Sequence, residues 1–109
     1  MIPGSVRIFV CVLPQDMRRS FDGLARAVED VLGEDPQSGA VFCFINKRAN
    51  RLKVLWWDRN GYCILYKRVD DAIFVLPGLP RGRLALRIDG PGMAKLVAGA
   101  KRERRRKRA

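Results

Sequence analysis

Lys and Arg are the residues of this chain whose number and spacing most clearly indicate a binding role. Of its 109 residues, 22 are Lys or Arg and 11 are Asp or Glu, so the formal net charge is +11. The excess lies in residues 46–68 and 101–109, where Asp58 and Glu103 are the only acidic side chains. Such clusters bind polyanions because each cation can neutralise a phosphate or a carboxylate. We therefore expect a nucleic acid or an acidic protein as partner.

The first stretch interleaves basic residues with aromatic rings, a composition typical of surfaces that bind phosphates and stack unpaired bases. Its candidate nucleic-acid-binding residues are Lys47, Arg48, Arg51, Lys53, Arg59, Lys67 and Arg68. Arg18 and Arg19 are second choices, because basic residues at the start of a helix oppose its dipole. The candidate stacking residues are Trp57, Tyr62 and Tyr66. In the alternative interpretation Trp57, Leu55 and Ile64 lie under another element, covered by the aliphatic parts of Lys and Arg.

The second stretch, residues 101–109, is a low-complexity tail that we expect to be disordered and to clamp DNA. Its basic residues are Lys101, Arg102, Arg104, Arg105, Arg106, Lys107 and Arg108. The alternative is a solvated end that only keeps the protein soluble. The tail lacks the Trp, Phe or Leu of an amphipathic membrane helix, and no apolar run reaches the roughly 18 residues of a membrane span. The first twelve residues do not resemble a secretory signal, so a cytoplasmic protein without membrane contact is expected.

Catalytic chemistry has little support in this sequence. Histidine, the commonest general base and metal ligand, is absent. Cys11, Cys43 and Cys63 are widely spaced, which predicts buried thiols in a reducing compartment and neither a zinc site nor a disulfide. The carboxylates are scattered, and there is no glycine-rich phosphate-binding loop. We therefore expect no enzyme activity, no cofactor, no metal and no small-molecule substrate.

The elements that must position the basic residues follow from hydrophobic periodicity. Residues 20–32 are predicted to form a helix that starts near Ser20 or Asp16 and ends before Gly33. Its apolar stripe is Phe21, Leu24, Val28, Val31 and Leu32. A short helix capped by Asp89 is predicted near the C-terminus, with an apolar stripe of Met93, Leu96, Val97 and Ala100.

The expected strands are residues 5–13, 41–45, 51–57, 62–69 and 83–88, with a further short strand at 74–76. In the strand at 83–88, Leu84, Leu86 and Ile88 are expected to point inward. These patterns predict an α+β fold: a mostly antiparallel sheet of about five strands, with one main amphipathic helix packed on one face. A short C-terminal helix and the basic tail complete it. Residues 1–100 would form a single domain.

The dipeptide Asn60-Gly61 predicts a hairpin turn centred on these two residues. The resulting register pairs Arg59 with Tyr62, Trp57 with Ile64, Leu55 with Tyr66 and Lys53 with Arg68. One face would carry Leu52, Val54, Trp56, Cys63, Leu65 and Val69, with Asp58 and Lys67 as polar members. The other face would carry Arg51, Lys53, Leu55, Trp57, Arg59, Tyr62, Ile64, Tyr66 and Arg68. We expect the first face to pack on the core and the second to present its basic residues to solvent together.

Two blocks of the chain resemble a known family. Residues 16–24 read D-M-R-R-S-F-D-G-L, and a second block runs from Asp35-Pro36 through Trp56-Trp57-Asp58 to Gly61. Lys67-Arg68, Phe74 and Pro77 continue the resemblance in order. The pattern resembles the Orf-two-like, TnpB-type accessory proteins of insertion sequences of the IS-sixty-six type. It covers roughly residues 3–77.

This resemblance implies a small bacterial protein that acts beside a separate transposase, which would carry out the polynucleotide transfer. Together with the basic residues, it leads to our hypothesis of a non-catalytic accessory protein that binds DNA in the nucleoid along with the transposase. The alternative is an adaptor that binds the transposase, with incidental DNA contact, and a third interpretation is an RNA-binding module. The sequence leaves the oligomeric state open.

Overall fold

A five-stranded sheet forms the centre of the molecule in the computed structural model, which describes residues 5–78 and 81–101. The strand order is β4-β3-β2-β1-β6, in which only β1 and β2 run parallel. The strands are β1 (Ile8–Cys11), β2 (Val41–Ile45), β3 (Arg51–Asp58), β4 (Gly61–Arg68) and β6 (Ala85–Ile88). A separate pair joins β5 (Ala72–Ile73) to β7 (Ala100–Lys101). The predicted α+β class is confirmed.

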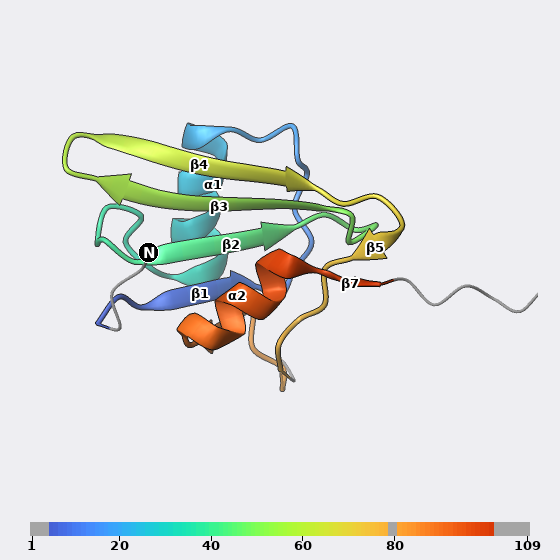
Figure 1. Cartoon of the computed structure of the whole chain (residues 1–109). Helices are drawn as coiled ribbons and strands as arrows, with labels where there is room; N and C mark the ends of the chain where they lie inside the picture. The colour runs from blue at the N-terminus through green and yellow to red at the C-terminus, as the bar shows by residue number, and fades with distance from the viewer. Residues whose placement is uncertain (1–4, 79–80, 102–109) are drawn as a thin grey trace, which may run out of the picture.

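The main helix covers one face of this sheet, behind the strands in Figure 1. It consists of α1 (Phe21–Ala27) continued by the π-helical turn η1 (Val28–Leu32). Leu24, Val28 and Leu32 pack against a cluster that includes Phe42 and Phe44 of β2. The helix ends at Gly33, whose φ of 65° is adopted most readily by a residue without a Cβ. The predicted stripe is confirmed except at Phe21, which remains 45% exposed at the first helical residue.

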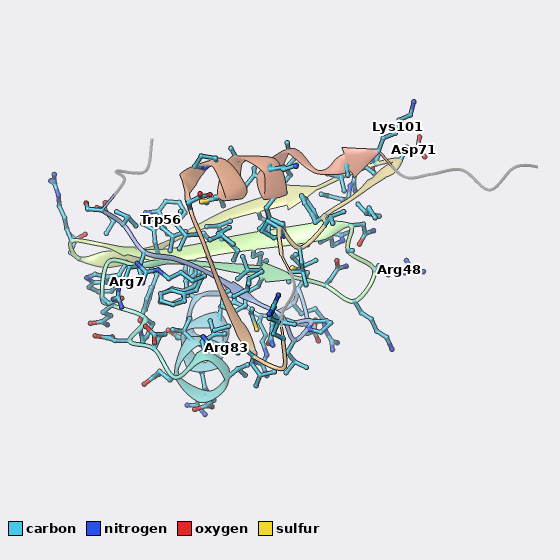
Figure 2. The ribbon with its side chains drawn as sticks, turned by 90° about the horizontal axis from the view of Figure 1, so that it is seen from below. Arg7, Arg48, Trp56, Asp71, Arg83 and Lys101 are labelled. Carbon is cyan, nitrogen blue, oxygen red and sulfur yellow. The ribbon has the colours of Figure 1, made fainter. Side chains whose placement is uncertain are left out.

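The second helix, α2 (Gly90–Ala98), covers the opposite face, so the sheet lies between two layers (Figures 1 and 2). Leu96 is buried in a cluster with Phe74 and residues of β1, β2 and β3, and Met93 and Val97 pack against this cluster. Asp89 caps the helix by accepting a hydrogen bond of 2.8 Å from the Gly92 amide, as predicted. Ala100 lies in β7, so its assignment to the helix stripe is wrong.

Several strand ends differ from the predictions because pairing, not hydrophobic alternation, decides where a strand stops. The strand expected at residues 74–76 is wrong, since β5 ends at Ile73. Strand β6 begins to pair with β1 at Ala85. Leu84 precedes this first pair and stays 48% exposed, so its inward placement is also wrong.

The hairpin of β3 and β4 has the predicted faces but a different register. Asp58 pairs with Gly61, which places Arg59 and Asn60 at the centre of the turn. Arg59 has a φ of 53°, and the Asn60 amide donates to the Asp58 carbonyl. The true pairs are Trp57–Tyr62, Leu55–Ile64, Lys53–Tyr66 and Arg51–Arg68, two residues away from the predicted ones. A shift of two leaves every side chain on its face, because side chains alternate with a period of two.

Candidate nucleic-acid interface

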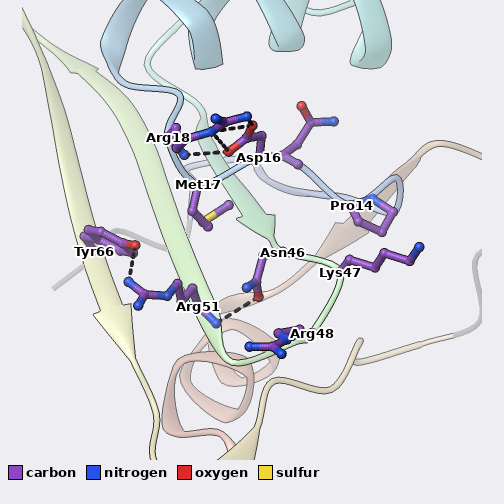
Figure 3. A pocket seen from close by; sticks show the side chains of 10 residues that line it. Pro14, Asp16, Met17, Arg18, Asn46, Lys47, Arg48, Arg51 and Tyr66 are labelled. Carbon is purple, nitrogen blue, oxygen red and sulfur yellow. Dashed lines mark hydrogen bonds and ion pairs between the residues drawn. The ribbon is translucent and has the colours of Figure 1, made fainter.

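A hollow of about 560 Å³ lies at the end of the sheet where β1 and β2 have their carboxyl ends (Figure 3). Because these two strands are parallel, the segments that follow them emerge side by side at this end. The start of β3 and the last part of β4 add to the same wall. The lining residues are Pro14, Gln15, Asp16, Met17, Arg18, Asn46, Lys47, Arg48, Arg51 and Tyr66.

The loop between β2 and β3 presents Lys47 and Arg48 at its exposed tip. Asn46 holds the loop closed, since its side-chain oxygen accepts from the amides of Asn50 and Arg51 at 3.0 and 2.9 Å. Its side-chain nitrogen donates to the Asn50 side chain at 2.7 Å. The two cations therefore stand on a tightly bonded turn at the rim of the hollow.

Asp16 and Arg18 form an ion pair on the opposite wall of the hollow (Figure 3). The guanidinium donates to both carboxylate oxygens at 2.6 to 3.1 Å, and the Arg18 amide donates at 2.9 Å. These bonds lower the pKa of Asp16 to about 2. The charge of Arg18 is thus balanced locally. By contrast, the ion pairs found among residues 5–78 and 81–101 do not include Lys47, Arg48 or Arg51.

Tyr66 contributes a half-exposed aromatic ring to this hollow, and two cations hold that ring in place. Its hydroxyl accepts a hydrogen bond of 2.7 Å from Nη1 of Arg51, drawn as a dashed line in Figure 3. Lys53, its cross-strand partner, places Nζ 4.7 Å from the ring centroid. Lys53 is only 7% exposed, and its ammonium donates to the Arg19 carbonyl at 2.6 Å. Lys53 therefore supports the wall and the start of the helix from beneath.

The other basic residues of the hairpin do not line the hollow, although Arg68 is the cross-strand partner of Arg51. Lys67 lies on the opposite face, where its Nζ donates to the Val97 carbonyl of α2 at 2.7 Å. Arg59 is in the turn at the far end of β3, about 26 Å from Arg51 at about 3.3 Å per residue. Arg68 is exposed and lies 3.5 Å from Asp70. The prediction that the basic residues of this face project together into solvent is therefore wrong for Lys53, which is buried, and for Arg59, which lies apart in the turn. The nucleic-acid role of all these residues stays a prediction.

Trp57 and Tyr62 are arranged as a pair instead of two free platforms. Their rings meet edge to face, with centroids 4.9 Å apart and planes at 75°. Tyr62 and Ile64 pack against the core beneath α1, and Leu55 on the same face is fully buried. The alternative in which this face lies under another element is thus confirmed for its central part. Of the three candidate residues, Tyr66 is exposed, whereas Trp57 and Tyr62 are partly buried.

Lys101, the first residue of the basic tail, is exposed in β7. Strand β5, its partner, is tied to the β2–β3 loop, because the amides of Val69 and Phe74 donate to the carbonyls of Asn50 and Ala49. Lys101 and Arg48 accordingly lie toward the same end of the molecule in Figure 2. The remaining candidates of the tail lie outside the described residues: Arg102, Arg104, Arg105, Arg106, Lys107 and Arg108.

A second cationic group, absent from the predicted site residues, surrounds Phe9 on the α1 side of the sheet. The guanidinium carbons of Arg7 and Arg87 lie 5.7 and 6.0 Å from the Phe9 ring centroid. Arg83 and Arg87 line a smaller hollow together with the exposed Leu84. The alternation of Arg83 and Arg87 in the sequence indicated a shared face. Nothing in the sequence placed Arg7 beside them, because that contact depends on the pairing of β1 with β6.

The thiols and carboxylates of the described residues form no reactive centre. Cys11 and Cys43 are buried, and burial raises the pKa of Cys43 to about 12. No group of three or more Cys, Asp or Glu side chains that could hold a metal is found within residues 5–78 and 81–101. Over the same ranges, no helix has the length and apolar character needed to cross a membrane.

Comparisons with known proteins assign the chain to a family. The family described as "IS66 Orf2 like protein" matches residues 6–107. Two proteins of Sinorhizobium fredii (strain NBRC 101917 / NGR234), "Uncharacterized protein y4hO" and "Uncharacterized protein y4jC", are 36% and 35% identical to the chain. The alignments cover 79% and 86% of this chain and 76% and 79% of the two relatives. No solved structure matches the chain. With a match over almost its whole length, the chain belongs to the IS66 Orf2-like family of insertion-sequence proteins.

Proposed function

We propose that the protein is a non-catalytic accessory factor that acts together with a separate transposase. It binds DNA through the hollow at the carboxyl ends of β1 and β2. Membership of the IS66 Orf2-like family gives the chain a transposition-associated accessory role. The observation that carries the DNA-binding part is the grouping of Lys47, Arg48 and Arg51 around one exposed hollow. None of the three takes part in the ion pairs of residues 5–78 and 81–101.

The physical basis of this binding is the release of counterions from DNA. Each phosphate neutralised by Lys or Arg releases condensed cations, so affinity falls steeply as salt rises. Lys47 and Arg48 stand on a tight turn, which lowers the entropy lost when they contact phosphates. Lys101 lies toward the same end of the molecule, and the basic residues that follow it in the sequence would add further phosphate contacts.

A matched pair of charge variants tests this proposal. Lys47→Ala with Arg48→Ala removes two charges at the hollow, and Arg26→Ala with Lys95→Ala removes two exposed charges from the helices. We expect the first variant to weaken binding to labelled duplex DNA about tenfold and to reduce the salt slope by about 1.8. The second should change both much less. Equal losses in the two variants would contradict a localised site and leave only a general effect of net charge.

An adaptor that binds the transposase is the second candidate function, favoured by the group around Phe9. Strand β6 has only β1 as a neighbour among the described strands, so its outer edge can accept an added strand. Arg83 and Arg87 flank that edge, and Leu84 adds an exposed apolar side chain. An acidic surface of the transposase would suit these residues. If this candidate is right, nuclease-treated transposase binds the wild-type chain but not Arg83→Glu with Arg87→Glu.

A further inference from the structure

The hollow combines cations with one accessible aromatic ring. Duplex DNA offers phosphates to the cations but no unstacked base to the ring. We propose that it seats an unpaired nucleotide of DNA, with the base against Tyr66 and the neighbouring phosphates on Lys47 and Arg48. This inference rests on the proposed DNA-binding function and specifies its ligand. It also selects one ring, because Trp57 and Tyr62 already contact each other edge to face beside the α1 core.

The Tyr66 ring is fixed in place before any ligand arrives. Arg51 donates to its hydroxyl at 2.7 Å, and Nζ of Lys53 lies 4.7 Å from its centroid. Lys53 is itself held by the Arg19 carbonyl. A ring held by two cations loses little freedom on binding, yet 48% of the residue remains exposed. These are the properties of a stacking platform, on which any base can lie because every base has a π face.

The charges around the ring separate a place for the base from a place for the phosphates. Lys47 and Arg48 form the cationic rim, whereas Asp16 places a carboxylate, ionised down to a pH of about 2, on the opposite wall. Because the Arg18 guanidinium binds both oxygens of this carboxylate and balances its charge, the opposite wall offers a phosphate no net attraction. Met17 and Pro14 add apolar surface to the lining. The backbone of a strand is thus directed to the rim and its base to the interior.

An unpaired strand is favoured over a duplex because the bases of a duplex are stacked on one another. Their faces are covered by the neighbouring bases and cannot stack on the Tyr66 ring, so a duplex would contact the rim cations alone. A single strand adds base stacking to the same phosphate contacts. We therefore expect Tyr66 to contribute to the binding of single strands and not of duplexes.

The test compares a short labelled single strand with the duplex of the same sequence at one salt concentration. Tyr66→Leu is expected to weaken binding of the single strand about tenfold and to leave duplex binding unchanged. Tyr66→Phe, which keeps the ring, should retain most of the affinity for the single strand. Phe21→Leu is the matched control, because it removes an equally exposed ring from the start of α1.

A second measurement leaves the protein unchanged. Replacing the bases of the single strand by abasic sites should weaken its binding to the wild-type chain to a similar degree. If abasic and intact strands bind equally, or if Tyr66→Leu weakens duplex and single strand alike, the inference is overturned while the DNA-binding function stands. If the wild-type chain binds neither form of DNA, both fail.

Discussion

Neighbouring basic residues in this chain have different environments, and the environment decides what each can do. Arg51 and Lys53 lie on the same face of β3, yet Arg51 lines the hollow while Lys53 is buried beneath Tyr66. Lys67 reaches across to α2 on the other face. The sequence predicted the face of each side chain correctly from period-two alternation. It did not reveal which cations are buried, because burial depends on where α1 crosses the sheet.

The buried position of Lys53 predicts a structural role. In Lys53→Met the Arg19 carbonyl loses the 2.6 Å hydrogen bond from the ammonium, and we expect the free energy of unfolding to fall by about 2 kcal/mol. Chemical denaturation measures this loss. Arg48→Met, an exposed control in the loop, should leave stability unchanged. A stable Lys53→Met protein with weakened DNA binding would instead assign Lys53 to the interface.

The Asp16–Arg18 pair predicts a pH dependence at low pH. The pKa of Asp16 falls from 3.8 to about 2, so the pair's contribution to stability is complete above pH 4 and is lost as the pH falls through about 2. The stability difference between the wild type and Asp16→Asn should therefore shrink over that range. A carboxyl NMR titration of Asp16 gives the pKa directly, and a midpoint near 3.8 would show that the pair is absent in solution.

At the scale of elements, the sequence predicts which segments form helices and strands more reliably than how the strands pair. The positions of the main strands and of both helices along the chain follow from hydrophobic periodicity. Gly33 marks the end of the main helix, and Asp89 marks the start of α2. The register of the β3–β4 hairpin does not follow from periodicity. The predicted and observed registers differ by two residues, and each side chain lies on the same face in both. The short pair β5–β7 was missed for a related reason. Two-residue strands carry no period, and their pairing joins segments distant in sequence.

The turn at Arg59 provides a test of this register. Arg59 has a φ of 53°, a conformation that costs a residue with a Cβ about 1 kcal/mol or more. Arg59→Gly should therefore raise the free energy of unfolding by about 0.5 kcal/mol, after the greater freedom of glycine in the unfolded chain is counted. Thermal denaturation measures the change. DNA affinity should hardly change, since Arg59 lies far from the hollow. A clear loss of stability would favour the turn centred on Asn60 and Gly61.

At the scale of the whole molecule, the hollow joins three segments that are distant in sequence. Residues 14–18, 46–51 and Tyr66 meet there because β1 and β2 are parallel and lie beside the β3–β4 hairpin. The basic stretch could be identified from composition alone. Its division into a rim of cations and a set of structural residues required the sheet order, which local patterns do not determine.

The tail supplies a prediction at the same scale. Deleting residues 102–109 removes six basic side chains and Glu103, and it leaves Lys101 in β7. We expect weaker binding to DNA of every sequence and a flatter dependence of affinity on salt, because phosphate contacts carry no base information. Binding isotherms at several salt concentrations provide the measurement. An unchanged slope would remove the tail from the interface.

The most direct test of the central claim is a map of the surface that DNA contacts. Backbone amide NMR spectra of the full chain, recorded with increasing amounts of DNA, report the affected residues one by one. The largest shifts are expected in residues 14–18, residues 46–51 and Tyr66, with little change at Arg59, Arg83 and Arg87. Shifts centred on the Arg59 turn or on β6, or no shifts at all, would contradict the assignment of the hollow as the DNA-binding site.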